Sequence, residues 1–158
     1  MPQSQADAAD FLDHAMHAGS NGAFFVIADP GDERYLGQID LTSINWKLRS
    51  ADMAIVMGAE GQRNRGIGTE AIGLMLEYAF LTLGLERVEL EVATANARAI
   101  RCYEKAGFRH EGVKRHAFRI DGEYADLAVM AVLSGEWRAA RAAEGGDRGE
   151  AGRAGKDG

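Results

Sequence analysis

Residues 63 to 71 combine glycine and arginine at a spacing suited to holding phosphate: Arg63-Asn64-Arg65-Gly66-Ile67-Gly68-Thr69-Glu70-Ala71. Glycine lets a backbone curl tightly and approach a ligand closely. An apolar segment with helical periodicity follows, and the first turn of a helix leaves unpaired N–H groups that carry a partial positive charge. Phosphate is the usual ligand of such a loop, and the two arginines add charge. The pattern predicts a site for a phosphate-bearing cofactor.

The glycine pattern alone leaves the identity of the cofactor open. A P-loop needs a lysine before the serine or threonine that follows the last glycine, and no lysine precedes Thr69. A dinucleotide-binding loop needs a third glycine near Ala71 and an acidic residue about 20 residues further on. Glu89 and Glu91 lie near that distance, but they alternate with apolar residues, as on the outer face of a strand. A surface turn with solvated arginines is the third interpretation.

A second constellation runs from Asn96 to Phe108: Asn-Ala-Arg-Ala-Ile-Arg-Cys-Tyr-Glu-Lys-Ala-Gly-Phe. Asn96 is a favourable helix cap, Tyr103 lies on the same helical face, and Gly107 is a typical helix end. With the upstream loop, this segment resembles the GNAT superfamily of acyl-coenzyme A-dependent N-acetyltransferases. The loop matches the family signature Gln/Arg-x-x-Gly-x-Gly/Ala, and the later stretch matches Asn-x-x-Ala-x-x-x-Tyr-x-Lys-x-Gly-Phe.

The resemblance covers about residues 22–135. Glu111-Gly112 and the segment 121–126 are similar to the branch that includes ribosomal-protein N-terminal, spermidine and amino-sugar acetyltransferases. The implied fold is α/β (α+β), with a mixed, mostly antiparallel sheet flanked by helices. A full GNAT fold begins with a strand and two helices, and too few residues precede Phe24 for all three. Three explanations stay open: the first strand is lost, the start is truncated, or a partner chain completes the sheet.

The resemblance also implies a cofactor site for acetyl-coenzyme A. In the family the pyrophosphate lies on the glycine loop, and the pantetheine arm pairs with the strand before it. Carried onto this sequence, the cofactor-binding residues are Val56, Met57, Arg63, Asn64, Arg65, Gly66, Ile67, Gly68, Thr69 and Asn96. A plain core strand is the alternative interpretation of Val56 and Met57, and both roles are compatible.

Tyr103 and Asp52 are the predicted catalytic residues. The Tyr103 phenol is suited to assist the leaving thiolate, although a core aromatic on an amphipathic helix is the alternative. Asp52 is the leading candidate for the base that deprotonates the amine, with an acid at a strand edge as the alternative. Weaker candidates are His116, Glu123 and Asp126. Cys102 is interpreted as a small core residue, because no histidine is placed to activate it.

These residues predict transfer of an acetyl group from acetyl-coenzyme A to a primary amine, on a small molecule or a protein N-terminus, directly within a ternary complex. The rival hypothesis is a non-catalytic acyl-coenzyme A-binding or regulatory domain. An absent first strand favours the rival, and the intact Tyr103 motif disfavours it. The acceptor is not encoded in any recognisable pattern.

Periodicity and turn signals predict the elements that position these residues. Strands are expected at 24–28, 35–41, 51–57 and 87–92, helices at 66–83 and from residue 96, and a final hairpin at 108–120 and 124–133. A short amphipathic helix is expected before Gly19. Residues 1–138 are predicted to form a single domain, and residues 139–158 a disordered tail rich in Gly, Ala and charge.

Composition narrows the partners. The 158 residues carry a formal net charge of −6, which disfavours nucleic acid and suits a cationic amine. The single cysteine excludes an internal disulfide, the scattered histidines match no metal-ligand spacing, and no apolar run has membrane length. The expected protein is cytoplasmic, binds acetyl-coenzyme A without a metal or a membrane, and is a candidate homodimer.

Overall fold

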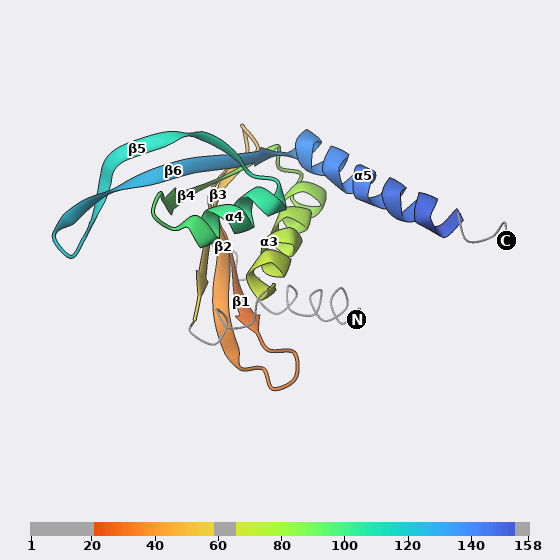
Figure 1. Ribbon diagram of the computed structural model, residues 1–158, viewed down its shortest axis with the longest axis horizontal. Helices are drawn as coiled ribbons and strands as arrows, with labels where there is room; N and C mark the ends of the chain where they lie inside the picture. Colours follow the sequence, from red (N-terminus) through yellow and green to blue (C-terminus); the bar gives the residue numbers. More distant parts are fainter. Residues whose placement is uncertain (1–20, 59–65, 154–158) are drawn as a thin grey trace.

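The computed structural model describes residues 21–58 and 66–153, with backbone alone beyond residue 145. This part of the chain forms one sheet in the order β1-β2-β3-β4-β6-β5 (Figure 1). Its strands are β1 Ala23–Ala28, β2 Tyr35–Asn45, β3 Ser50–Met57, β4 Arg87–Ala93, β5 Arg109–Ile120 and β6 Glu123–Leu133. The helices are α3 Ile67–Glu77, continued by the π-helical turn η1 Tyr78–Thr82, then α4 Ala97–Ala106 and α5 Ser134–Arg153.

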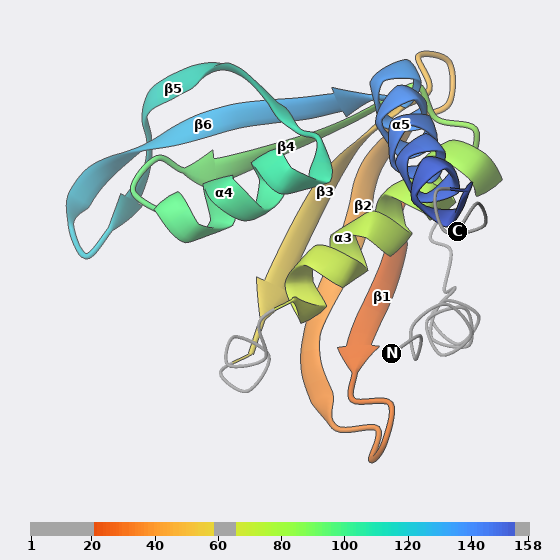
Figure 2. The same ribbon diagram turned by 45° about the vertical axis from the view of Figure 1, so that its right-hand side comes forward.

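The sheet is mixed and mostly antiparallel, which confirms the predicted fold class. Four of its neighbouring strand pairs are antiparallel, and only β3 and β4 run parallel. Their parallel register is short, because it joins only Ser50–Asp52 to Arg87–Glu89. Beyond it the two strands diverge, as Figure 2 shows, so that the sheet opens between β3 and β4.

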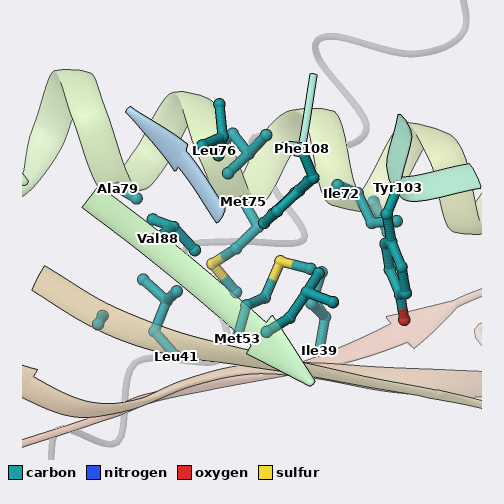
Figure 3. Close-up of a cluster of buried hydrophobic side chains, with 14 of the residues drawn as sticks. Ile39, Leu41, Met53, Ile72, Met75, Leu76, Ala79, Val88, Tyr103 and Phe108 are labelled. Atoms are coloured by element: carbon teal, nitrogen blue, oxygen red, sulfur yellow. The ribbon is translucent and has the colours of Figure 1, made fainter. Parts of the chain in front are cut away.

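One face of the sheet carries the core, beneath α3 and α4 (Figures 1 and 2). Strand β4 alternates as predicted: Val88, Leu90 and Val92 are buried, while Glu89 and Glu91 point to the opposite face. Figure 3 shows side chains of α3 and of the strands meeting in this core, among them Ile39, Leu41, Met53, Ile72, Met75 and Leu76. The opposite face has no described helix over it, and we call it the open face.

The helix predicted over residues 66–83 forms with a change of hydrogen bonding near its end. After Glu77 the chain makes one π turn, in which the Leu83 N–H donates to the Tyr78 carbonyl at 2.9 Å. The Tyr78 ring packs edge-on against Phe25, with ring centroids 5.4 Å apart. Gly84 then ends the element with φ +67°, a conformation that glycine adopts without strain.

Helix α5 runs from Ser134 to Arg153, through most of the segment 139–158 for which the sequence predicts disorder. Its first turns are anchored: Trp137 packs on Phe80, with ring centroids 5.5 Å apart, and Arg141 lies 4.9 Å over the Trp137 ring and 3.5 Å from a Glu77 carboxylate oxygen. Alanine and arginine, which have high helix propensity, make up residues 138–143, so the helix continues past this anchor.

Two predictions fall outside the described residues, namely the amphipathic helix before Gly19 and the end of the tail at 154–158. The proposed loss of a first strand also concerns residues that the structure does not describe. Within the described sheet, β1 pairs along one edge only, with β2. No helix of the described chain is both long enough and apolar enough to span a bilayer.

Candidate active site

The opening between β3 and β4 lies at the centre of the candidate site. Past the Asp52–Glu89 pair, the described parts of the two strands share no ladder. An edge of this kind presents backbone N–H and C=O groups with which an extended polar chain can pair. Val56 and Met57 lie on the diverging part of β3, where the sequence places them, with Val56 exposed and Met57 half-buried. Their predicted pairing with a pantetheine arm stays a prediction.

Helix α3 begins beside the end of β3 with the geometry of an anion site. Its N-cap, Gly66, has φ +109° and makes no side-chain cap hydrogen bond, so the first-turn N–H groups have no capping side chain. A β-carbon built on Gly66 or Gly68 would meet no atom of the described chain within 4 Å. The open space and the N–H groups of Ile67, Gly68 and Thr69, which precede the first intrahelical hydrogen bond at Glu70, fit a phosphate group. Arg63, Asn64 and Arg65 lie outside the described residues.

Helix α4 positions Tyr103. The Asn96 side chain caps the helix by accepting a hydrogen bond from the Ala99 N–H at 3.2 Å, and Gly107 closes it with φ +106°. Both capping predictions are confirmed, whereas contact between Asn96 and the cofactor is untested. Tyr103 is 9% exposed, and its ring packs against Phe108 with centroids 5.9 Å apart. Tyr103 is therefore a core aromatic, which the alternative interpretation predicted, and this leaves the hydroxyl for a further role.

The Tyr103 hydroxyl points away from α4 toward the sheet (Figure 3). It has no hydrogen-bond partner in the described chain. Because every fully buried side-chain oxygen of the described chain has a partner, the Tyr103 hydroxyl is not fully buried and retains access to solvent or ligand. Burial, and secondarily the neighbouring Cys102, raise the pKa of the phenol to about 12. The group is protonated at neutral pH, so it can donate a proton or a hydrogen bond but cannot act as a base.

Asp52 lies at the point where β3 and β4 part, on the open face. Its strand neighbours Ala51 and Met53 are buried on the other face, so Asp52 and Tyr103 flank the sheet from opposite sides. Partial burial, followed by repulsion from Glu89 and Glu91, raises the pKa of the Asp52 carboxyl above its usual value. A raised pKa improves a carboxylate as a proton acceptor. The side chain is exposed, so solvent limits the size of this effect.

Charged side chains in register surround Asp52 on the open face. Arg87 donates to Glu111 at 2.8 and 2.5 Å and to Glu89 at 2.6 Å. The bond from Arg87 lowers the pKa of the Glu111 carboxyl. Lys114 donates to Glu91. Sequence reasoning placed Glu89 and Glu91 on an outer strand face but missed the pairing of Glu91 with Lys114, because the two residues are 23 positions apart.

The remaining candidates lie elsewhere. Cys102 is half-buried, and its sulfur lies 3.1 Å from the Thr69 hydroxyl, so it helps join α4 to the start of α3. His116 and Asp126 lie on the β5–β6 hairpin, where the His116 N–H donates to Asp126 at 2.8 Å and the His116 ring stacks on Tyr124. Glu123 begins β6 at the tip of this hairpin. Among the described residues, no group of His, Cys, Asp and Glu side chains is arranged to hold a metal ion.

Comparison with known proteins agrees with this geometry. The model of the acetyltransferase (GNAT) domain matches residues 1–109. The chain belongs to the GNAT family of acetyltransferases. This GNAT acetyltransferase is 33% identical, over 131 residues, to the spermidine N(1)-acetyltransferase of Escherichia coli K12, a match that covers 83% of the chain and 68% of that relative.

Two solved structures of the Vibrio cholerae spermidine N-acetyltransferase match the fold, each with a TM-score of 0.71. One is a complex with CoA and spermine, 30% identical to this GNAT acetyltransferase, and the match covers 87% of the chain and 80% of that structure. The other is dodecameric, 32% identical, with 75% and 68% covered. These relatives support catalysis over the rival binding-domain hypothesis. This GNAT acetyltransferase is an acetyl-coenzyme A-dependent N-acetyltransferase.

Proposed function

We propose that the enzyme acetylates a primary amine on a small polycationic acceptor of the polyamine class. The observation that carries the proposal is the position of Asp52, which faces the strand opening with Glu89 and Glu91 beside it on the open face. Carboxylates in such a row attract a ligand with more than one ammonium group. The spermidine acetyltransferases among the relatives, and the net charge of −6, support the same acceptor class.

The cosubstrate supplies an activated acetyl thioester, and the protein's part is to hold it in place. The first turn of α3 and the preceding arginines, Arg63 and Arg65, would hold its phosphates. The backbone of Val56 and Met57 would pair with its pantetheine arm. Asn96 lies at the start of α4, which covers the same face of the sheet as α3 (Figure 2). This assignment places the thioester at the opening between β3 and β4.

Asp52 and Tyr103 would then act from opposite faces of the sheet, Asp52 on the attacking amine and Tyr103 on the leaving sulfur. Asp52, directly or through a water, accepts the proton of the attacking amine as the bond between nitrogen and the acetyl carbon forms. Tyr103 donates to the sulfur as the carbon–sulfur bond breaks and the thiolate leaves. Transfer in this arrangement needs both substrates bound at once, so it proceeds through a ternary complex without an acyl-enzyme.

An acceptor panel tests the proposal. Release of free thiol from acetyl-coenzyme A would be measured with spermidine, 1,3-diaminopropane, propylamine, free amino acids and a peptide with an unblocked N-terminus, against hydrolysis without amine. We expect kcat/KM to be highest for spermidine and the diamine. A preference for the peptide would replace the polyamine proposal with an N-terminal acetyltransferase.

Asp52→Asn isolates the proposed base. The substitution keeps the shape of the side chain and removes its proton-accepting charge, so we expect kcat to fall by roughly 100- to 10,000-fold with little change in affinity for acetyl-coenzyme A. Asp40→Asn, on the neighbouring strand β2, is the matched control. Equal activity of both variants would assign the proton to water alone.

Self-association is part of the proposal. The dodecameric relative supports it, and β1 pairs along only one edge within the described sheet, which leaves backbone groups for another chain. Light scattering on the purified enzyme would give the number of subunits, and a monomer at all concentrations would contradict it.

A further inference from the structure

A lysine of the protein itself already pairs with one carboxylate on the open face. The Lys114 ammonium donates to Glu91 on β4, two residues beyond the Glu89 that stands opposite Asp52. Asp52 has no ion-pair partner in the described chain. The acidic row formed by Asp52, Glu89 and Glu91 is therefore partly neutralised by Lys114.

The two cations of this face are held very differently. Arg87 donates three hydrogen bonds to Glu89 and Glu111, and its side chain is only 30% exposed. Lys114 reaches a single carboxylate, and its side chain is 58% exposed. Its flexible stem starts on β5, in register with Leu127 of β6 and through it with Ala93 of β4, so the ammonium must extend across β6 to meet Glu91. A lysine on one exposed partner is more easily displaced than a forked arginine on two.

We propose that Lys114 is a specificity-determining residue that weakens the binding of acceptors with a second ammonium group. This role of Lys114 rests on the proposed function, in which the reacting amine lies at Asp52. Two residues along a strand span about 6.6 Å, so Glu91 lies one such step beyond Glu89 on the same face. A short diamine with one nitrogen at Asp52 can direct the other toward Glu91, where it meets the Lys114 ammonium. The diamine must displace that lysine, whereas a monoamine need not.

The electrostatics of the face agree with this placement. Lys114 lowers the pKa of Asp52, and Glu91, Glu89 and Asp52 all raise the pKa of Lys114, so the lysine and the acidic row interact. The groups that face Asp52 are thus Glu89, Glu91 and Arg87 from β4 and Lys114 from β5.

Lys114→Met tests the proposal, because methionine keeps an apolar side chain of similar length and removes the charge. The probes are 1,3-diaminopropane and propylamine, which share a carbon chain and differ by one amine. We expect KM for the diamine to fall by up to about fivefold, the upper range for an exposed ion pair, while KM for propylamine and both kcat values stay within about twofold. Arg119→Met is the matched control: it removes one positive charge from the same strand, from a residue that contacts the Tyr124 ring and the Gly122 carbonyl instead.

A second variant shows whether Glu91 is the shared partner. Glu91→Gln should raise KM for the diamine, and in the double variant Lys114→Met/Glu91→Gln the gain from Lys114→Met should disappear. Equal KM changes for both amines, the same changes in Arg119→Met, or a gain that persists without Glu91 would overturn the role of Lys114. Failure of the unmodified enzyme to acetylate spermidine or either probe would instead refute the acceptor class, and the Lys114 proposal with it.

Discussion

Replacing Tyr103 by phenylalanine removes one oxygen from the proposed site and leaves the packing in place. The ring of Tyr103 is buried and contacts Phe108, and phenylalanine preserves both features. The hydroxyl has no hydrogen-bond partner in the described chain, so its loss leaves no buried group unpaired. We therefore expect the melting temperature of Tyr103→Phe to match that of the unmodified enzyme.

The effect on the reaction should be large. General-acid assistance contributes roughly 100- to 10,000-fold to a rate, which corresponds to about 2.7 to 5.4 kcal/mol of transition-state stabilisation. The charge on the sulfur develops only during the reaction, so kcat should fall while the Kd for acetyl-coenzyme A stays nearly constant. Because the pKa of Tyr103 is raised to about 12, the phenol stays protonated through pH 9, and the loss should be the same at every pH from about 6 to 9.

Steady-state turnover with spermidine and calorimetry with acetyl-coenzyme A check these two expectations on one preparation. Tyr103→Ala is the structural comparison, because loss of a buried aromatic ring costs about 3 to 5 kcal/mol of stability. A Tyr103→Phe variant whose kcat stays within about twofold of the unmodified enzyme, far below the expected range, would show that the phenol only packs. A rate loss that disappears toward pH 9 would point to a titrating group other than Tyr103.

Two further predictions concern helices α3 and α5. Gly68→Val places a β-carbon beside the α3 N-terminus, where no described atom lies within 4 Å, so we expect an unchanged melting temperature but acetyl-coenzyme A binding weakened by roughly tenfold or more in calorimetry. Gly73→Val, further into α3, is the control, and equal affinities would refute the phosphate site. A chain ending after Arg141 keeps the Trp137 contacts with Phe80, so stability and turnover should persist, whereas ending it before Trp137 should lower the melting temperature; a loss already at Arg141 would show that the distal helix docks.

Local patterns predicted most of the individual elements. Every expected strand forms within a few residues of its predicted bounds, because apolar periodicity and turn signals are local properties of the sequence. The caps at Asn96 and Gly107 were predictable for the same reason, since each acts on backbone groups within a few residues. The Asp121-Gly122 turn also follows local rules, with φ +51° and +82°.

Departures from prediction occur where several conformations have similar local cost. Nothing in the sequence near Tyr78 distinguishes an α turn from the π turn that forms there. The tail composition favours either disorder or a helix, and contacts of Trp137 and Arg141 with residues some sixty positions earlier in the chain accompany the helix. Local propensity sets the alternatives, and tertiary contact selects among them.

The sequence by itself indicated the family and predicted a phosphate-binding loop and the residue types that could assist acetyl transfer, because motif spacing and helix caps are short-range properties. Only the tertiary structure decided how those residues are arranged around the site. The opening between β3 and β4 depends on the pairing of strands that are separated by helix α3, and it sets Asp52 and Tyr103 on opposite faces of the sheet. The link between Lys114 and Glu91 crosses an intervening strand and 23 positions of sequence. Such contacts follow from strand order and register, which are set by packing of the whole sheet rather than by neighbouring residues.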